Sequence, residues 1–320
     1  MSSRLGLVAG LVALAALIAL PFLAEKFYAQ LFTKILIMAI FAMSLDLLIG
    51  YTGLVSFGHA AFYGVAAYTL ALVTPQYEAA SIWTSLPLAM GVAALLALLI
   101  GLLVLRTSGI YFIMVTLAFA QMVYFVFHDT KLAGGSDGIF VYVRPVFEVF
   151  GWRPLDLEEF RDFYFVALGC AVGVFLLLRV VLGSLFGRVI AGVRVNEHRM
   201  RSLGYPTFRY KLVCFTLAGA IAGLAGWLSA VQFGVVNPDF LAWHLSGSVI
   251  MMVILGGMGT LVGPMIGAAA IMLAEIGFQE VTEHWQLLMG GFIVLVALLL
   301  PNGLLGLLAR KSESKAVARG

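Results

Sequence analysis

The sequence predicts an all-α, polytopic membrane protein with about ten transmembrane segments. Hydrophobic residues make up 62% of the chain and charged residues only 11%, and the mean hydropathy is +1.06. A soluble domain usually carries about a quarter charged residues. Apolar runs long enough to cross about 30 Å of hydrocarbon recur from end to end, which predicts transmembrane helices. Such continuous runs differ from the alternating pattern of a transmembrane β-barrel and exclude that class.

Ten apolar segments are expected to cross the membrane. They lie at residues 5–24, 29–49, 53–74, 84–105, 109–127, 163–182, 210–232, 245–258, 261–277 and 285–308. The first follows Arg4 and resembles the start of a secretory signal. Its apolar run is longer than a usual signal core and nine more segments follow, so we expect a retained first span. The whole chain, 1–320, is then a single transmembrane domain.

Two of these segments, the third and the eighth, contain glycine-rich stretches that interrupt the helical pattern. GYTGLVSFGHAAFYG occupies residues 50–64, and LGGMGTLVGPMIG occupies residues 255–267 and includes a proline. Irregular backbone at membrane depth is tolerated only where protein or a water-filled cavity surrounds it. The glycines have similar spacing in both stretches, which indicates two related halves, and broken helices at matching places point to a translocation pathway.

Basic residues predict which side of the membrane the loops and termini face. Ten crossings place both termini on one side, together with Arg106, Arg179, a basic stretch at 183–209 and Lys211. That side holds 13 Lys and Arg against two carboxylates, whereas the rest of the chain has 6 basic and 14 acidic residues. By the positive-inside rule, both termini and the basic stretch are cytoplasmic. The loop at 128–162, with seven carboxylates and four cations, then faces outside.

The basic stretch predicts a short amphipathic helix over residues 188–203. At about 100° per residue, five side chains fall within an arc of about 80° and four arginines point away. The arc holds Val189, Val193, Asn196, Met200 and Leu203, and the arginines are Arg188, Arg194, Arg199 and Arg201. Gly204 suits the end of the helix, and Pro206 prevents its continuation. Amphipathicity alone leaves two interpretations open: a helix lying on lipid headgroups, or a helix docked in the groove of a cytoplasmic partner.

This stretch resembles the cytoplasmic coupling segment of ABC-importer permeases, in which glycine follows an acidic residue at seven positions. Glu197 and Gly204 match that pattern, whereas Arg199 and Met200 stand near the place of a usual Ala-Ala pair. Further motifs occur in the order, and roughly the spacing, of branched-chain amino-acid ABC-transporter permeases of the LivM type. These are GYTGLVSFGHAAFYGVAAY, GIYFIMVTLAFAQ, GGSDGI, RYKLVCFTLAGAIAGLAG, VILGGMGTLVGPMIGA and PNGLLG. The resemblance covers about residues 30–306.

The resemblance implies a permease subunit that moves branched-chain amino acids, or related small polar solutes, by alternating access across the cytoplasmic (inner) membrane of a bacterium. It implies a homologous second permease, two ATPase subunits and an extracytoplasmic solute-binding protein as partners. The chain has no Gly-x-x-x-x-Gly-Lys-Ser/Thr motif, so ATP and Mg²⁺ are expected in the ATPases, with no catalytic residue, cofactor or metal here. The alternative is a stand-alone proton-coupled transporter, with Asp46 or Glu275 as the coupling carboxylate.

Three groups of residues are candidates for functional sites. The group expected to couple to the ATPase is Gly187, Arg188, Arg194, Asn196, Glu197, Met200, Leu203 and Gly204. The group expected along the substrate pathway is Asp46, Thr52, Gly53, Ser56, Gly58, Thr116, Gln121, Gly256, Gly257 and Gly259. The group expected at an external gate is Gly134, Gly135, Ser136, Asp137 and Gly138.

Structural alternatives stay open for several of these candidates. An ionisable group left in lipid costs at least about 2.5 kcal/mol, so Asp46 is a functional candidate, but it equally suits a cap on the break at Gly50. One polar partner each across helices would satisfy Thr116 and Gln121. His59 is interpreted as a residue packed against a neighbouring helix. The loop at residues 134–138 is either a turn or a gate.

Other features are interpreted as structural. Overlapping pairs of small residues between 218 and 226 predict close helix packing. Residues 237–239, Asn-Pro-Asp, predict an external turn after the seventh segment. Cys170 and Cys214 lie in apolar segments and are interpreted as small buried hydrophobes rather than a disulfide or a metal pair.

Overall fold

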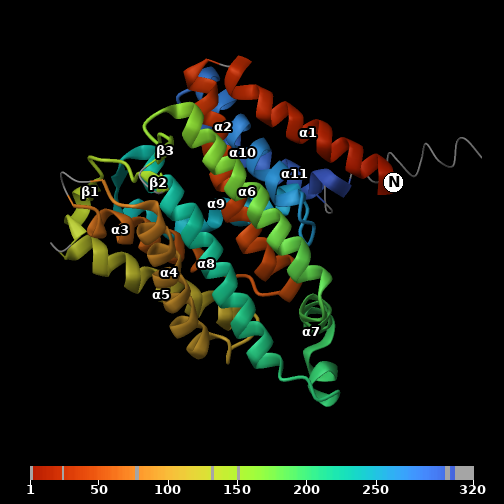
Figure 1. The fold of residues 1–320 in the computed structure, drawn as a ribbon. Coiled ribbons are helices and arrows are strands. Elements are labelled where there is room, and N and C mark those ends of the chain that lie inside the picture. The colour runs from red at the N-terminus through yellow and green to blue at the C-terminus, as the bar shows by residue number, and fades with distance from the viewer. Residues whose placement is uncertain are drawn as a thin grey trace, which may run out of the picture.

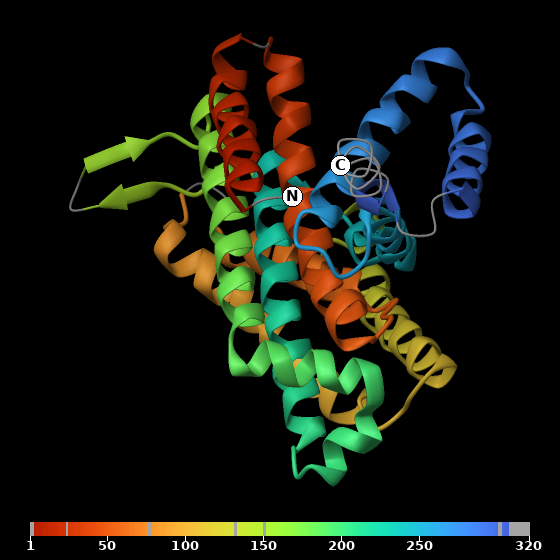
Figure 2. The ribbon, with the colours of Figure 1, turned by 90° about the vertical axis from the view of Figure 1, so that its right-hand side faces the viewer.

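The computed structural model describes residues 3–23, 25–75, 79–130, 133–149, 152–299 and 303–306. Its helices are packed into one bundle (Figures 1 and 2). They are α1 (Ser3–Leu23), α2 (Lys26–Asp46), α3 (His59–Val73), α4 (Ile82–Val104), α5 (Ile110–Asp129), α6 (Phe160–Gly183), α7 (Leu185–Ser202), α8 (Thr207–Phe233), α9 (Trp243–Gly256), α10 (Gly263–Val281) and α11 (Trp285–Leu299). A π-helical stretch, η1 (Leu47–Thr52), continues α2. Each of the ten expected segments overlaps one of these helices, and α7 lies in the basic stretch.

Six of the described helical segments are long and apolar enough to cross a membrane. They are Lys26–Thr52, Ile82–Val104, Ile110–Asp129, Phe160–Gly183, Thr207–Phe233 and Gly263–Val281. Three further apolar helices are shorter: His59–Val73, Trp243–Gly256 and Trp285–Val296. The prediction of an all-α membrane protein is confirmed. The count of ten spans and the side on which the termini lie stay predictions.

Helices α2 and α8 form the centre of the bundle. The most apolar window of α2 with η1 is 89% buried and that of α8 is 72% buried, against 17–33% for α4, α5, α6 and α10. The outer helices expose apolar side chains such as Leu103, Met114 and Val180. Apolar residues on the outside are stable when the surrounding solvent is lipid, so the burial pattern fits a membrane bundle.

Small residues hold α8 against its neighbours, as the sequence predicted. A Cβ added at Gly223 would lie 2.7 Å from the Cβ of Ala93 on α4, and one at Gly219 would collide with Ala97. Gly226 contacts the backbone of Tyr63 on α3 in the same way. These glycines let the helix backbones approach closely, which gives dispersion contacts where lipid offers no hydrophobic driving force. The two cysteines are free, and Cys214 is buried in α8.

Short strands occur where the sequence predicted only a loop and a turn. Strand β1 (Ile139–Phe140) pairs with β4 (Val235–Val236), and β2 (Phe147–Val149) pairs with β3 (Trp152–Leu155), both antiparallel. The strands lie away from α7, at the other end of the bundle (Figures 1 and 2). Backbone N–H and C=O groups in a long connection need partners, and pairing two segments supplies them. The expected turn at 237–239 coincides with the start of a 3₁₀ turn, η4 (Pro238–Leu241), which Asn237 precedes.

Candidate functional site

Helix α7 is two short helices, and not the single amphipathic helix predicted over 188–203. Asn196 between them has extended backbone angles, φ −159° and ψ 96°. Its Oδ1 accepts a hydrogen bond from the N–H of Arg199 at 2.9 Å, so Asn196 caps the second helix. Asparagine side chains compete with the backbone for such donors and favour N-caps over helix interiors. The prediction of one continuous helix is wrong at this residue.

The break also divides the predicted apolar arc. Val189 and Val193 are buried in the first half of α7. In the second half Met200 is only half-buried, and Leu203 is 66% exposed. The first half therefore packs on the bundle, whereas the second half presents apolar surface outward. The start of α7 is equally close-packed, because a Cβ added at Gly187 would lie 2.5 Å from the Cα of Leu182.

Gly204 ends the second half of α7 in the manner the sequence predicted. Its φ of 86° lies in the left-handed region. The N–H of Tyr205 donates to the carbonyl oxygen of Met200 at 3.1 Å, and the N–H of Gly204 donates to that of Arg201 at 2.9 Å. This pair of bonds is a Schellman motif, which glycine favours because it carries no Cβ. An added Cβ would meet no atom within 4 Å, so the glycine is required by its backbone angle and not by crowding.

A cluster of charged and polar groups ties the second half of α7 to the first turns of α8. Glu197 pairs with Arg201 at 2.6 Å and with Lys211 of α8 at 2.9 Å. The hydroxyl of Thr207, buried at the start of α8, donates to Glu197 at 3.0 Å. Burial by itself raises the pKa of Glu197, but the hydrogen bonds from Lys211 and Arg201 outweigh it, and the net pKa lies below the ordinary value of 4.5. Glu197 is therefore a carboxylate held by several donors.

Arg194 extends from the first half of α7 to the break between α2 and α3. Its Nη1 donates a hydrogen bond to the carbonyl oxygen of Gly50 in η1. Because η1 ends at Thr52, its last carbonyl oxygens lack partners within the helix and accept bonds from elsewhere. Gly53, with φ 76°, follows, and a Cβ there would lie 3.3 Å from Cγ of Arg194. One arginine side chain thus lies along both glycines.

Asp46, the last residue of α2, contacts the second glycine-rich stretch. Its Oδ1 accepts a hydrogen bond from the N–H of Gly259 at 2.9 Å, and it makes no capping bond to η1. The side chain is 1% exposed, and Oδ2 has no hydrogen-bond partner among the described residues. The capping alternative is therefore wrong in its geometry. The carboxylate instead joins two breaks that are far apart in sequence.

The two glycine-rich stretches are in direct contact. A Cβ added at Gly50 would lie 2.7 Å from the Cα of Gly259. One added at Gly259 would lie 3.0 Å from the carbonyl oxygen of Gly50 and 3.2 Å from Nη1 of Arg194. We call Asp46, Gly50, Gly259 and Arg194 the glycine junction, because side chains on either glycine would separate its parts. Segments from α2, α7 and the α9–α10 connection meet there.

The α9–α10 connection itself depends on glycine. Gly257 and Gly259 have positive φ angles of 115° and 76°. Gly256 packs against the backbone of the next helix, where an added Cβ would lie 3.1 Å from the N of Gly267. The connection therefore folds back tightly, and α9 and α10 lie close together.

The hydroxyl-bearing pathway candidates form local bonds. Thr52 donates to the carbonyl oxygen of Leu48 at 2.6 Å, and Ser56 accepts from the N–H of Gly58 at 3.2 Å. Thr116 on α5 accepts from the N–H of Phe57, in the break before α3, at 3.3 Å, and donates to the carbonyl oxygen of Ile113 in its own helix at 2.8 Å. It therefore has two partners and not the one partner across helices that the sequence predicted. Gly58 packs against Thr116, because a Cβ added at Gly58 would lie 2.7 Å from the carbonyl oxygen of Thr116.

Two further polar residues lie outside this network. Gln121 is half-buried farther along α5. His59 is buried, with Nε2 at 2.8 Å from Oγ of Ser44 on α2 and its ring stacked on Phe41. These contacts fit the interpretation of His59 as a packed residue.

Comparison with known proteins identifies the family. Residues 27–298 match the family described as branched-chain amino acid transport system / permease component. The chain belongs to this permease family. It is 32% identical to the high-affinity branched-chain amino acid transport system permease protein LivM of Salmonella typhimurium, over 90% of this chain and 72% of that protein. The corresponding protein of Escherichia coli K12 is 32% identical, over 92% of this chain and 74% of that protein.

A shorter stretch of the permease is similar to a second type of subunit. The permease protein LivH of Escherichia coli K12 is 29% identical over 38% of this chain and 40% of that protein. No solved structure gives a significant match. The resemblance drawn from the motifs is confirmed, and the comparisons give no support to a stand-alone proton-coupled transporter. The chain is thus a multi-pass permease of the cytoplasmic membrane.

Two loops pack together at the end of the permease opposite α7: the loop at residues 134–138 and the connection after α8. The sequence did not indicate that they are in contact. Residues 135–137 form a 3₁₀ turn, η3 (Gly135–Asp137), and β1 follows it. Gly138 lies against the connection after α8, where an added Cβ would be 2.8 Å from the Cα of Asn237. Gly134, with φ 76°, and exposed Ser136 complete the loop. The candidate gate and the predicted external turn therefore form one surface.

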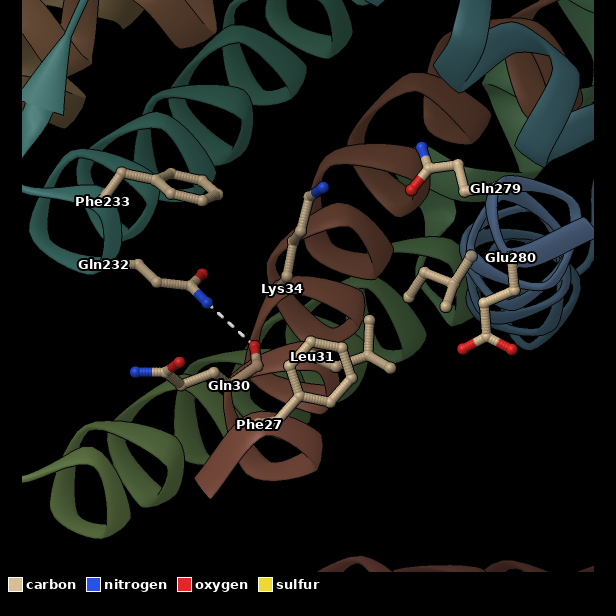
Figure 3. A pocket seen from close by; sticks show the side chains of 9 residues that line it. Phe27, Gln30, Leu31, Lys34, Gln232, Phe233, Gln279 and Glu280 are labelled. Carbon is tan, nitrogen blue, oxygen red and sulfur yellow. Dashed lines mark hydrogen bonds between the residues drawn. The ribbon is translucent and has the colours of Figure 1, made fainter. Parts of the chain in front are cut away.

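The sequence interpretation missed a pocket at this same end. Its lining comes from the first half of α2 and the last turns of α8 and α10 (Figure 3). It includes Lys34, which lies inside the second expected segment, and Glu280 at the end of α10. A charge within an apolar run is a signal that could have selected Lys34.

Proposed function

We propose that this permease imports branched-chain amino acids, or related small polar solutes, as the membrane subunit of an ATP-driven importer. The support is the family match together with the glycine junction, in which the coupling segment touches both broken stretches of the bundle. Its partners are a homologous second permease, two ATPase subunits and an extracytoplasmic binding protein. The relatives named LivM and LivH are consistent with a pair of permeases.

The second half of α7 is the proposed docking element for an ATPase. It is tied to α8 through Glu197, and the side chain of Leu203 at its end is 66% exposed, as is that of Val195, just before the break, at 85%. A helix that seats in a groove needs such apolar anchors on a rigid support. The proposed coupling group is Gly187, Arg188, Arg194, Asn196, Glu197, Met200, Leu203 and Gly204, of which the members before Asn196 lie in the first half of α7 and Gly187 is buried there. ATP and Mg²⁺ bind in the ATPases, and this chain holds no cofactor.

Alternating access then follows from a movement of α7. Closure of the ATPases shifts the coupling segment, and Arg194 passes that shift to the carbonyl of Gly50. Asp46 carries it on to the α9–α10 connection through its bond to Gly259. Because the two stretches are broken helices, their backbone changes direction at low cost, as in other transporters with discontinuous helices.

The proposed orientation places α7 and both termini in the cytoplasm, with ten spans. The support is the excess of Lys and Arg at the α7 end and of carboxylates in the loop 128–162. The surface formed by residues 134–138 and the connection after α8 then faces the binding protein and acts as the external gate.

The test is reconstitution of the permease with its partners in liposomes. Uptake of radiolabelled leucine is expected only when the ATPases are present and ATP is supplied on the side of the membrane where they lie. Collapse of a proton gradient should leave this uptake unchanged. Leucine uptake by the isolated chain, driven by a proton gradient, would show that the proposed function is wrong.

A further inference from the structure

An open pocket of about 580 Å³ lies between α2, α8 and α10 at the end opposite α7. Its volume is within the range of roughly 300–1,000 Å³ that small-molecule sites occupy. The lining residues lie near the start of α2 and the ends of α8 and α10. In the proposed orientation the pocket opens outward, where a solute arrives.

The pocket carries one cation and one anion on different helices. Lys34 is half-buried on α2, and Glu280 comes from α10. Figure 3 shows them on separate helices, with Phe27 and Leu31 on the same helix as Lys34. No ion pair joins the two side chains in the described structure, so each charge is available to a ligand of opposite sign.

Apolar groups and an unused acceptor complete the lining. Phe27, Leu31 and Phe233 supply apolar surface. Gln232 donates from Nε2 to the carbonyl oxygen of Gln30 at 2.9 Å (dashed in Figure 3). Its Oε1 is buried and has no hydrogen-bond partner among the described residues. A buried acceptor is destabilising unless a donor reaches it, so a ligand with N–H groups would satisfy it.

We propose that this pocket binds a free α-amino acid with an apolar side chain, in its zwitterionic form. The Lys34 ammonium pairs with the ligand carboxylate, Glu280 pairs with the ligand ammonium, and Phe27, Leu31 and Phe233 contact the ligand side chain. The proposal rests on the proposed function and deepens it, since it assigns the substrate class to particular residues. None of the pathway candidates drawn from the sequence lines this pocket.

The experiment measures binding of radiolabelled leucine to the complete complex in nanodiscs, without the binding protein. Lys34→Met and Glu280→Gln each remove one charge and keep most of the side-chain length. Each is expected to weaken leucine binding about tenfold, because one charge-assisted contact is lost. Lys26→Met and Glu283→Gln, matched changes at exposed residues outside the pocket, should leave binding unchanged.

Leucine analogues separate a direct contact from a structural effect. The acid 4-methylpentanoate lacks the ammonium, and 3-methylbutylamine lacks the carboxylate. Glu280→Gln should weaken leucine but leave the acid unaffected, and Lys34→Met should weaken leucine but leave the amine unaffected. A parallel loss for leucine and both analogues, or no loss in either variant, would overturn the assignment.

Other results bear on the pocket and on the proposed function separately. If ATP-driven leucine uptake occurs but the wild-type complex binds no leucine in this assay, the pocket proposal is wrong while the function stands. If Lys34→Met or Glu280→Gln loses the second permease on gel filtration, the pocket is a subunit contact and the proposal is also wrong. Absence of ATP-driven uptake by the wild type would refute the proposed function itself.

Discussion

Arg194 on α7 donates a hydrogen bond to the carbonyl oxygen of Gly50, at the end of the buried helix at the centre of the bundle. The acceptor is a backbone atom, so a displacement of the arginine acts on the path of the chain and not on a flexible side chain. The same guanidinium lies beside Gly259, because a Cβ added at Gly259 would lie 3.2 Å from Nη1 of Arg194. One side chain therefore bridges the surface segment and both broken stretches.

Replacing Arg194 should uncouple ATP hydrolysis from transport. Arg194→Ala removes a charged donor to a helix-end carbonyl, a contact of about 1.5–3 kcal/mol. Uptake is expected to fall by about tenfold or more, while the ATPases still co-purify, because the second half of α7 keeps its own bonds to α8. Uptake and hydrolysis are measured in proteoliposomes.

Two further variants make the Arg194 result specific. Arg209→Ala changes an exposed arginine at the same end of the bundle and should leave uptake near wild type. Arg194→Lys keeps the charge on a shorter, single-headed group and should restore uptake only in part. Wild-type uptake by Arg194→Ala would exclude the bond to Gly50 as a coupling contact.

Asp46 should act as a hydrogen-bond acceptor whose charge is dispensable. Asp46→Asn retains an oxygen that can accept from Gly259, so assembly and uptake should stay near wild type, and uptake should be flat from about pH 5 to 8. Asp46→Ala leaves that N–H without a partner and should destabilise the permease by about 1–3 kcal/mol. Thermal unfolding in detergent and uptake report the two effects. Lost uptake by an assembled Asp46→Asn would show that the charge itself is needed.

Periodicity and composition predicted most of the helices. The apolar runs marked the ten helices because lipid demands both apolar side chains and internal backbone hydrogen bonds. The end of α7 was equally predictable, since Gly204 and Pro206 are strong local signals. Such features depend on residues close together in sequence.

Contacts between distant residues were not predictable in the same way. Asp46 and Gly259 are 213 positions apart, and nothing local indicates that one binds the other. The break at Asn196 was missed because the apolar period continues through it, while the side chain's bond to Arg199 decides the backbone. Likewise, Lys34 and Glu280 approach one pocket only because the start of α2 and the end of α10 lie at the same side of the bundle.

Glu197 predicts a defined pH dependence. Its pKa lies below the ordinary value of 4.5, because bonds from Lys211 and Arg201 outweigh the effect of burial. A group with a lowered pKa in the folded state stabilises that state above its unfolded pKa, and the stabilisation disappears as the pH falls through the lowered value. The wild type should therefore exceed Glu197→Gln in melting temperature by a constant margin from about pH 6 to 8, and the margin should shrink below about pH 4.5.

The matched control for Glu197 is Glu283→Gln, an exposed carboxylate that follows α10. Its melting temperature should equal that of the wild type at neutral pH. A margin between wild type and Glu197→Gln that stayed constant down to about pH 3 would mean that the carboxylate is not held by these donors.

Gly204 distinguishes a docked α7 from one that lies on lipid. Its positive φ is required by the turn, while the space around it is empty within the permease. Gly204→Val should strain the backbone turn and displace the docking surface, so the ATPases should no longer co-purify or respond to substrate, although the permease still inserts.

Two controls separate shape from charge at this turn. Gly204→Asn should be close to wild type, because asparagine tolerates the left-handed region. Arg199→Lys with Arg201→Lys keeps the summed charge that a lipid contact needs and should also leave coupling intact. The measurement is a pull-down of the ATPases together with substrate-stimulated hydrolysis for all three variants. Normal coupling in Gly204→Val would show that no partner recognises the shape of this turn, and that α7 lies on the membrane surface instead.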